Sequence, residues 1–172
     1  MVNFINIKQP KIFNRQLPYR MVIVFLCFSN VTSAQTEKIK WISFEQLDDS
    51  LSIKPKKVFI SFYADWCVYC KKMDRSGFQD TDVISRLNES YYAVKMNAES
   101  TEEIEFDGKI FRNLEIGKKR RPNHQLALLL ASRKNYPFTL PATITLDENF
   151  SVTYRYFEYL SPKDLKEILK KD

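Results

Sequence analysis

Residues 58–71 read VFISFYADWCVYCK, and this stretch decides the fold. Its first part, Val58–Tyr63, is a nearly continuous apolar and β-prone run, as expected of a central strand buried on both faces. Two cysteines separated by two residues follow, and no helix breaker occurs from there to Arg75. The pattern predicts a buried strand that leads into a Cys-x-x-Cys pair at the start of a helix.

Cys67 and Cys70 would lie about one helical turn apart, close enough for a disulfide to open and close with little backbone movement. At the helix N-terminus, Cys67 meets unpaired backbone N–H groups and the positive end of the helix dipole, which lower its thiol pKa. We therefore predict that Cys67 is the nucleophile and the more exposed thiol. Cys70, one turn deeper, would resolve the mixed disulfide.

Three alternatives to a redox pair are open. A zinc site needs about four ligands, and one His beside this Cys pair supplies too few, so we expect no metal and no other cofactor. A structural disulfide closing so short a loop would constrain the unfolded chain little. Spacing alone does not separate a functional pair from a coincidental one, but the strand before it and the helix after it make the pattern specific.

The length of 172 residues, 44% of them hydrophobic, suits one core better than two domains. The formal charge of +6 invites a nucleic-acid partner. However, four of the 27 basic residues lie in the first 34 positions, which contain no acid, so residues 35–172 carry 23 basic and 21 acidic side chains. We expect a balanced, solvated surface and no nucleic-acid partner.

Residues 1–34 have the order of a cleavable signal peptide: basic residues, the apolar run Met21–Phe28, then small and polar residues. Cleavage after Ala34 would leave Gln35 as the first residue of a periplasmic or secreted protein, in a compartment that permits disulfides. The apolar run makes about 12 Å of helix against a bilayer core of about 30 Å, which argues against a permanent span. A disordered tail or an uncut anchor are the alternatives.

The rest of the chain alternates helices and strands, which predicts an α/β fold with a mixed sheet. Four helices are expected besides the one after Cys67: one at 44–51 with a Ser43/Gln46 capping box, one capped by Thr81 or Asp82, one capped by Asn123, and a last one opened by Ser161–Pro162. The expected strands are one at 91–96 and a hairpin of 142–146 and 151–156.

Residues 97–123 interrupt this alternation. Five acids lie within Glu99–Asp107, and the basic run Lys118–Arg121 follows. We predict a small hairpin or an ordered excursion with a solvated charged surface; contact of the basic run with an acidic partner or a nucleic acid is the alternative. His124, the single histidine, is expected to be a surface or capping residue and not a catalyst.

The stretch Phe62–Lys71 resembles the active-site segment of thioredoxin-fold proteins, most of all the C-terminal thioredoxin-like domain of the bacterial transmembrane thiol:disulfide interchange reductase. Further similar segments are Val94–Asn97, Leu140–Thr143 and Phe157–Leu169. The resemblance implies a thioredoxin fold, a central mixed sheet flanked by helices, in a single domain at 35–172 with 97–123 as an insertion.

The resemblance also implies site roles. Cys67 and Cys70 would be catalytic, and Pro141 would follow a cis bond beside them, as an X-Pro bond allows. The implied partner-binding residues are Trp66, Val68, Tyr69, Leu140 and Pro141, and the implied supporting residues are Asp65, Lys95 and Glu158.

Three departures from the family pattern stand out. Ser61 replaces the buried Asp that assists proton transfer at the second cysteine, although Lys95, the usual neighbour of that acid, remains. Glu158 replaces a usual Gly, and we expect its carboxylate to face solvent; the alternative is that it supplies a substitute carboxylate. Val68-Tyr69 lacks the Pro-His pair of the strong periplasmic oxidant, which predicts a more reducing couple.

These features predict an exported thiol:disulfide oxidoreductase, a reductase or isomerase that acts on thiols and disulfides of other exported proteins and depends on an upstream thiol reductant. The alternative is a non-enzymatic thioredoxin-like binding module with vestigial cysteines. The sequence leaves the oligomeric state open.

Overall fold

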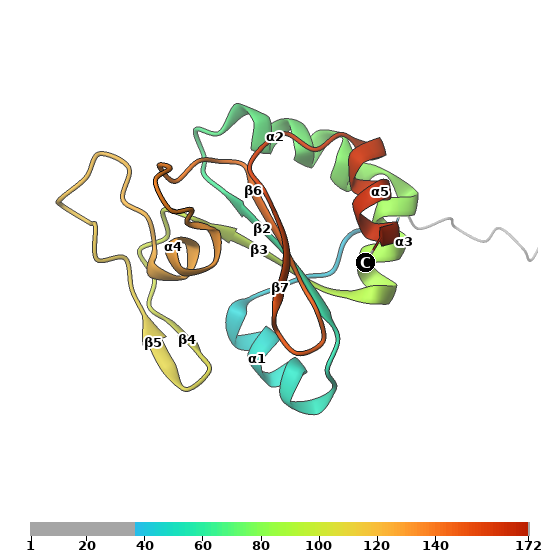
Figure 1. The fold of residues 1–172 in the computed structure, drawn as a ribbon, viewed down its shortest axis with the longest axis horizontal. Coiled ribbons are helices and arrows are strands. Elements are labelled where there is room, and N and C mark those ends of the chain that lie inside the picture. The colour runs from blue at the N-terminus through green and yellow to red at the C-terminus, as the bar shows by residue number, and fades with distance from the viewer. Residues whose placement is uncertain (1–36, 172) are drawn as a thin grey trace, which may run out of the picture. The chain divides into compact units, whose positions relative to one another are not determined.

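A computed structural model describes residues 37–171, and its centre is a five-stranded mixed sheet in the order β1-β3-β2-β6-β7 (Figure 1). The parallel strands β1, β3 and β2 occupy one side, and β6 and β7 continue the sheet antiparallel. The strands are β1 (Trp41–Ile42), β2 (Lys57–Tyr63), β3 (Tyr91–Asn97), β6 (Ala142–Leu146) and β7 (Val152–Tyr156).

Helices cover both faces of this sheet (Figure 1). Buried side chains of α1 and α4 pack on the face that carries Val58, Ile60 and Phe62. Side chains of α2, α3 and α5 pack on the opposite face, which carries Phe59. The helices are α1 (Phe44–Ile53), α2 (Val68–Arg75), the 3₁₀ turn η3 (Gly77–Gln79), α3 (Thr81–Ser90), α4 (Gln125–Ala131) and α5 (Pro162–Lys171).

The α/β class and the mixed sheet are confirmed, because β2 is the central strand and is buried on both faces. The capping box of Ser43 and Gln46 is present at α1. The Ser161 hydroxyl accepts the Asp164 N–H at 3.3 Å at the start of α5. Strand β1 was not expected, since two residues are too short to show the alternation that marks a strand.

Two predicted helix caps are wrong by one or two positions. Asp80, not Thr81 or Asp82, caps α3, because its Oδ1 accepts the N–H groups of Asp82 and Val83 at 3.1 and 3.3 Å. At α4 the cap is His124 and not Asn123: His124 Nδ1 accepts the Leu126 N–H at 3.2 Å.

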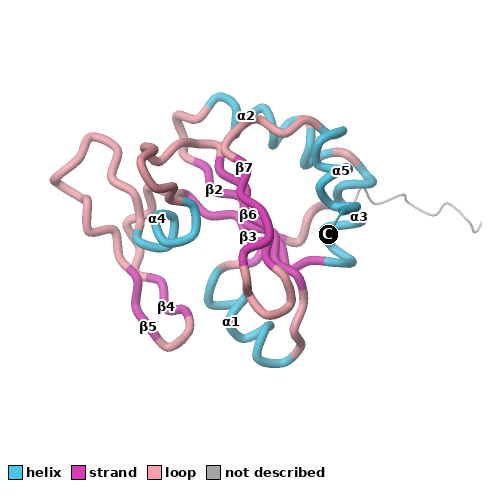
Figure 2. Tube along the Cα trace, viewed as in Figure 1, coloured by secondary structure: helices cyan, strands magenta, loops and turns pink. Residues whose placement is uncertain are grey.

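Residues 97–123 contain the expected small hairpin, formed by β4 (Ile104–Phe106) and β5 (Lys109–Phe111). Figure 2 shows this hairpin standing apart from the central sheet. Asp107 and Gly108 form its turn with φ of 52° and 65°, the left-handed conformation that favours an Asp-Gly pair. Phe106 anchors the hairpin edge-to-face against Phe44 of α1, with ring centroids 5.4 Å apart.

The expected signal peptide at 1–34 and its cleavage site at Ala34–Gln35 lie outside the described residues. Within 37–171, none of the helices has both the length and the apolar character needed to cross a bilayer.

Candidate functional site

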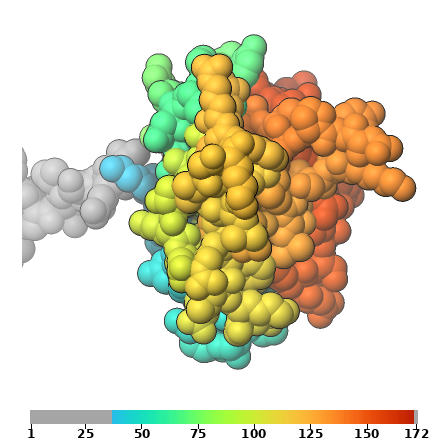
Figure 3. Space-filling view, turned by 90° about the vertical axis from the view of Figure 1, so that its left-hand side faces the viewer, coloured from blue at the N-terminus to red at the C-terminus, as the bar shows by residue number. Residues whose placement is uncertain are grey.

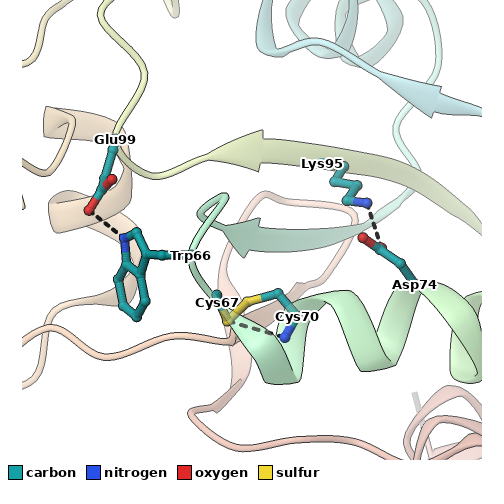
Figure 4. Close-up of a disulfide and its surroundings, with 6 residues drawn as sticks. All are labelled: Trp66, Cys67, Cys70, Asp74, Lys95 and Glu99. Carbon is teal, nitrogen blue, oxygen red and sulfur yellow. Dashed lines mark hydrogen bonds and ion pairs between the residues drawn. A yellow bond between two sulfur atoms is a disulfide. The ribbon is translucent and has the colours of Figure 1, made fainter.

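The Cys67–Cys70 pair lies where β2 leaves the sheet, and in this structure it is a disulfide with Cα atoms 5.3 Å apart (Figure 4). A turn closed by the Cys67 N–H to Ala64 carbonyl bond, 2.9 Å, carries the chain from the strand to the helix. Cys67 is the N-cap of α2, and its Sγ accepts the Cys70 backbone N–H at 3.1 Å. One sulfur of the pair is therefore directed at the unpaired N–H groups of the helix start.

The prediction that Cys67 is the more exposed thiol concerns the reduced protein, and this disulfide form does not test it. Cys67 is 3% exposed and Cys70 is 5% exposed, so both are buried. The asymmetry between the two cysteines lies in the hydrogen bond to the Cys67 sulfur and not in accessible surface.

Three exposed apolar side chains form a rim beside the buried disulfide. Trp66 is 43%, Val68 74% and Tyr69 60% exposed, so these side chains are surface residues and not members of the core. The Tyr69 ring lies 6.4 Å from the ring of Tyr159, between centroids. The rim presents exposed apolar area immediately before and after Cys67, which suits contact with another protein.

The Leu140–Pro141 peptide bond is cis, as expected from the resemblance. Phe62 pairs with Ala142 in the sheet, so this segment enters β6 at the edge where β2 runs out toward Cys67. Arg133 supports the segment from outside, because its guanidinium donates to the Thr139 hydroxyl at 3.1 Å.

Below α2 the sheet carries hydroxyl groups at the position where the family pattern has the carboxylate of a buried Asp. Ser61 is buried and lies opposite Lys95 on β3 and opposite Thr143 on β6. The Thr143 hydroxyl is buried and has no hydrogen-bond partner among residues 37–171. The acid that pairs with Lys95 comes from the helix: Asp74, one turn after Cys70, accepts the Lys95 ammonium at 2.5 Å (Figure 4).

Tyr63, at the end of β2, has a phenol with a raised pKa. Burial raises the pKa of its phenol, and the nearby carboxylates of Asp65 and Asp74 raise it further. Asp65 is exposed beside the rim, and Glu158 is exposed as expected from the sequence.

Two residues of the 97–123 segment reach the rim, and sequence reasoning did not single them out. The Trp66 indole Nε1–H donates to the Glu99 carboxylate at 2.8 Å (Figure 4). The Arg121 guanidinium lies over the Trp66 ring, 3.7 Å from its centroid. No local sequence signal marks these contacts, whereas Asp74 is foreshadowed by its position four residues after Cys70 on one helix face.

His124 is capping, as expected, but it is fully buried and not a surface residue. Its backbone N–H donates to Ala98 at 2.7 Å, and its Nε2 lies 3.1 Å from the Glu102 carbonyl. Burial lowers the pKa of its imidazole. Within 37–171, His, Cys, Asp and Glu side chains form no group of three or more that would hold a metal ion.

Residues 45–171 match the model of a family described as a thioredoxin-like domain. The chain is 33% identical over 85 residues to the thiol:disulfide interchange protein DsbD of Colwellia psychrerythraea, a match that covers 46% of this chain and 14% of that protein. The chain therefore spans a small part of the length of its curated relatives.

Two solved structures share the fold. A DsbH oxidoreductase is 18% identical with a TM-score of 0.52, covering 78% of this chain and 83% of that one. A thioredoxin from Thermus thermophilus is 14% identical with a TM-score of 0.51, covering 78% and 86%. These matches confirm the fold and the resemblance expected from residues 62–71, and the chain belongs to the thioredoxin-like family.

Proposed function

We propose that this member of the thioredoxin-like family is an exported thiol:disulfide oxidoreductase that reduces or isomerises disulfides of other exported proteins. The observation that carries the proposal is the hydrogen bond from the Cys70 N–H to the Cys67 sulfur at the N-cap of α2, 3.1 Å. In the reduced protein the same donor and the helix dipole stabilise a thiolate at Cys67, and the thiolate is the attacking species.

The reaction follows from the two positions. The Cys67 thiolate attacks one sulfur of a partner disulfide and expels the other as a thiolate, leaving a mixed disulfide. Cys70 loses its proton, attacks the Cys67 sulfur and releases the second partner thiolate. Two electrons pass to the partner, the one proton that Cys70 loses goes to a released partner thiolate or to solvent, and the Cys67–Cys70 disulfide is the oxidised product.

A complete cycle needs a reductant outside this part of the chain. An upstream thiol must reduce the Cys67–Cys70 disulfide again, because the described residues hold no other cysteine. Since Val68-Tyr69 between the cysteines contains no histidine to stabilise the thiolate further, the reduced form is not strongly favoured. The couple is then suited to donating electrons.

Partner contact is assigned to Trp66, Val68 and Tyr69 together with the Leu140–Pro141 segment. The apolar rim lies on one side of the disulfide, and the cis-proline segment enters the sheet beside the end of β2. An extended partner peptide would pair with the backbone of Leu140 while its sulfur meets Cys67.

Insulin reduction with dithiothreitol as the electron source tests the proposal. The wild-type chain should accelerate precipitation of the insulin B chain, and Cys67→Ser should return the rate to that of dithiothreitol alone. Cys27→Ser in the full chain is the matched control and should behave as the wild type. Equal rates for the wild type and Cys67→Ser would favour a binding module with vestigial cysteines.

Export has a separate test. Protein recovered from the periplasm of expressing bacteria should begin at Gln35 when its N-terminus is sequenced. A chain that still begins at Met1 in the cytoplasmic fraction would contradict the signal-peptide assignment.

A further inference from the structure

The basic run Lys118–Arg121 lies beside the redox site. In Figure 3 the amber part of the 97–123 insertion is seen in front of the green surface of the α2 region. The contact is specific, because the Arg121 guanidinium stacks on Trp66 at 3.7 Å and Trp66 directly precedes Cys67. The sequence alone predicts that this charged segment is a solvated surface. In the structure it is part of the surroundings of the disulfide.

Trp66 is held on two sides by the insertion. Glu99 accepts its indole N–H at 2.8 Å, and Arg121 covers one face of its ring. The Glu99 carboxylate is thereby engaged, and the ring remains 43% exposed for a partner. The insertion residues that contact Trp66 thus form a surface next to Cys67, which is called the wall below.

The outward charge of this wall is positive. Lys118, Arg120 and Arg121 are exposed, and none of them has a salt-bridge partner among residues 37–171. Lys119 is the one member of the run that is paired, with Glu115. Asp65 and Glu99 place two carboxylates near the rim, and these do not offset the three cations that lack a salt bridge.

We infer that the insertion docks a protein partner whose cysteine is flanked by acidic residues, an inference that rests on the proposed redox function. Free cations beside a reactive sulfur attract a negatively charged segment and steer it toward Cys67. A protein segment fits better than a nucleic acid. The ring that Arg121 covers belongs to the rim of a disulfide, and only a partner that carries a sulfur atom can react with that disulfide.

The test compares three disulfide-linked peptides with the same cysteine core and flanks of Glu, Gln or Lys. The chain is reduced with dithiothreitol and desalted, and its single-turnover reduction of each peptide is followed at low and high salt. Wild type should reduce the Glu peptide about 10-fold faster than the Gln peptide at low salt, in the range of electrostatic steering, and the ratio should approach one at high salt.

The variant Lys118→Glu/Arg120→Glu should abolish or invert this ratio. A ratio is used so that any general loss of activity cancels. Lys38→Glu/Lys54→Glu is the matched control, because it reverses two exposed charges at the end of the sheet where β2 begins, away from the disulfide. This control should keep the wild-type ratio.

Three outcomes would overturn the inference. If the wild type reduces the neutral hydroxyethyl disulfide but treats the Glu and Gln peptides alike, the docking surface is wrong and the redox function stands. If no disulfide is reduced, the proposed function fails and the inference falls with it. Binding of a fluorescent single-stranded oligonucleotide that is lost in the Lys118→Glu/Arg120→Glu variant, with no peptide preference, would assign the run to nucleic acid.

Discussion

The strand–disulfide–helix unit at 57–75 and the arm of the insertion at 112–123 meet at Trp66, but different forces order them. In β2 the five residues Val58–Phe62 are all buried and pack between two helical layers. In the arm Asn113 is the one buried residue, and polar contacts hold the backbone. Apolar burial on this scale resists local opening, whereas a polar arm opens at lower cost.

The arm is nevertheless well connected. The Asn113 side-chain amide donates to the carbonyls of Ser100 and Pro122 at 3.1 and 3.0 Å and accepts the Glu115 N–H at 3.2 Å. The Glu115 carboxylate in turn accepts the Asn123 N–H at 2.9 Å. The comparison teaches that apolar packing orders the strand–disulfide–helix unit, while the surface beside it depends on a few hydrogen bonds.

The largest expected effect concerns the two cysteines of the strand–disulfide–helix unit. Cys70→Ser should accumulate mixed disulfides with partner proteins, because the attacking thiol remains and its resolver is gone. Cys67→Ser should accumulate none. Non-reducing electrophoresis of both variants after exposure to oxidised partner proteins measures this, and equal trapping by both would refute the assignment of roles.

The next effect tests the apolar half of the comparison. Phe62→Ala should lower the free energy of unfolding by about 3–5 kcal/mol, the usual cost of removing a fully buried aromatic ring. Phe62 belongs to the core on the α1 side of the sheet and stacks on Phe44, so the loss should be global. Urea unfolding followed by circular dichroism provides the number, and a loss below about 1 kcal/mol would contradict the packing described.

A smaller and local effect should follow from Asn113→Ala. Two part-buried carbonyls lose their donor, at a cost of about 1–3 kcal/mol. Amide hydrogen exchange should quicken at 113–123 and stay unchanged in β2. An equal increase in both regions would mean that the arm and β2 unfold as one unit, which would remove the distinction drawn above.

The smallest effect is a pH dependence at the base of the arm. Burial lowers the pKa of His124 in the folded protein, whereas an exposed imidazole in the unfolded chain titrates near 6.5. As the pH falls through that value, the unfolded state gains a proton that the folded state does not take up, so stability falls.

His124→Asn keeps a good helix cap and removes this titration. The melting temperature of the variant should therefore fall less than that of the wild type between pH 7.5 and pH 5.5. Carboxylates with lowered pKa values, such as Asp80 and Glu115, are common to both proteins and cancel in the difference. Parallel losses in the two proteins would show that His124 does not control this dependence.

Much of the local structure was determined by the sequence alone. The strand Val58–Tyr63, the helix after Cys67 and the caps at Ser43 and Ser161 arise from residues within one or two turns of each other. Interactions of that range act in any fold that keeps the local backbone, so composition and spacing suffice to predict them.

Tertiary structure alone decided how the disulfide is surrounded. Glu99 lies 33 positions from Trp66, and Arg121 lies further along the chain, yet both contact one indole ring. The burial of His124 likewise depends on Ala98 and Glu102. Such contacts form only when the sheet has brought the end of β3 beside the end of β2. No periodicity or local propensity encodes them, because the residues that meet are far apart in the sequence.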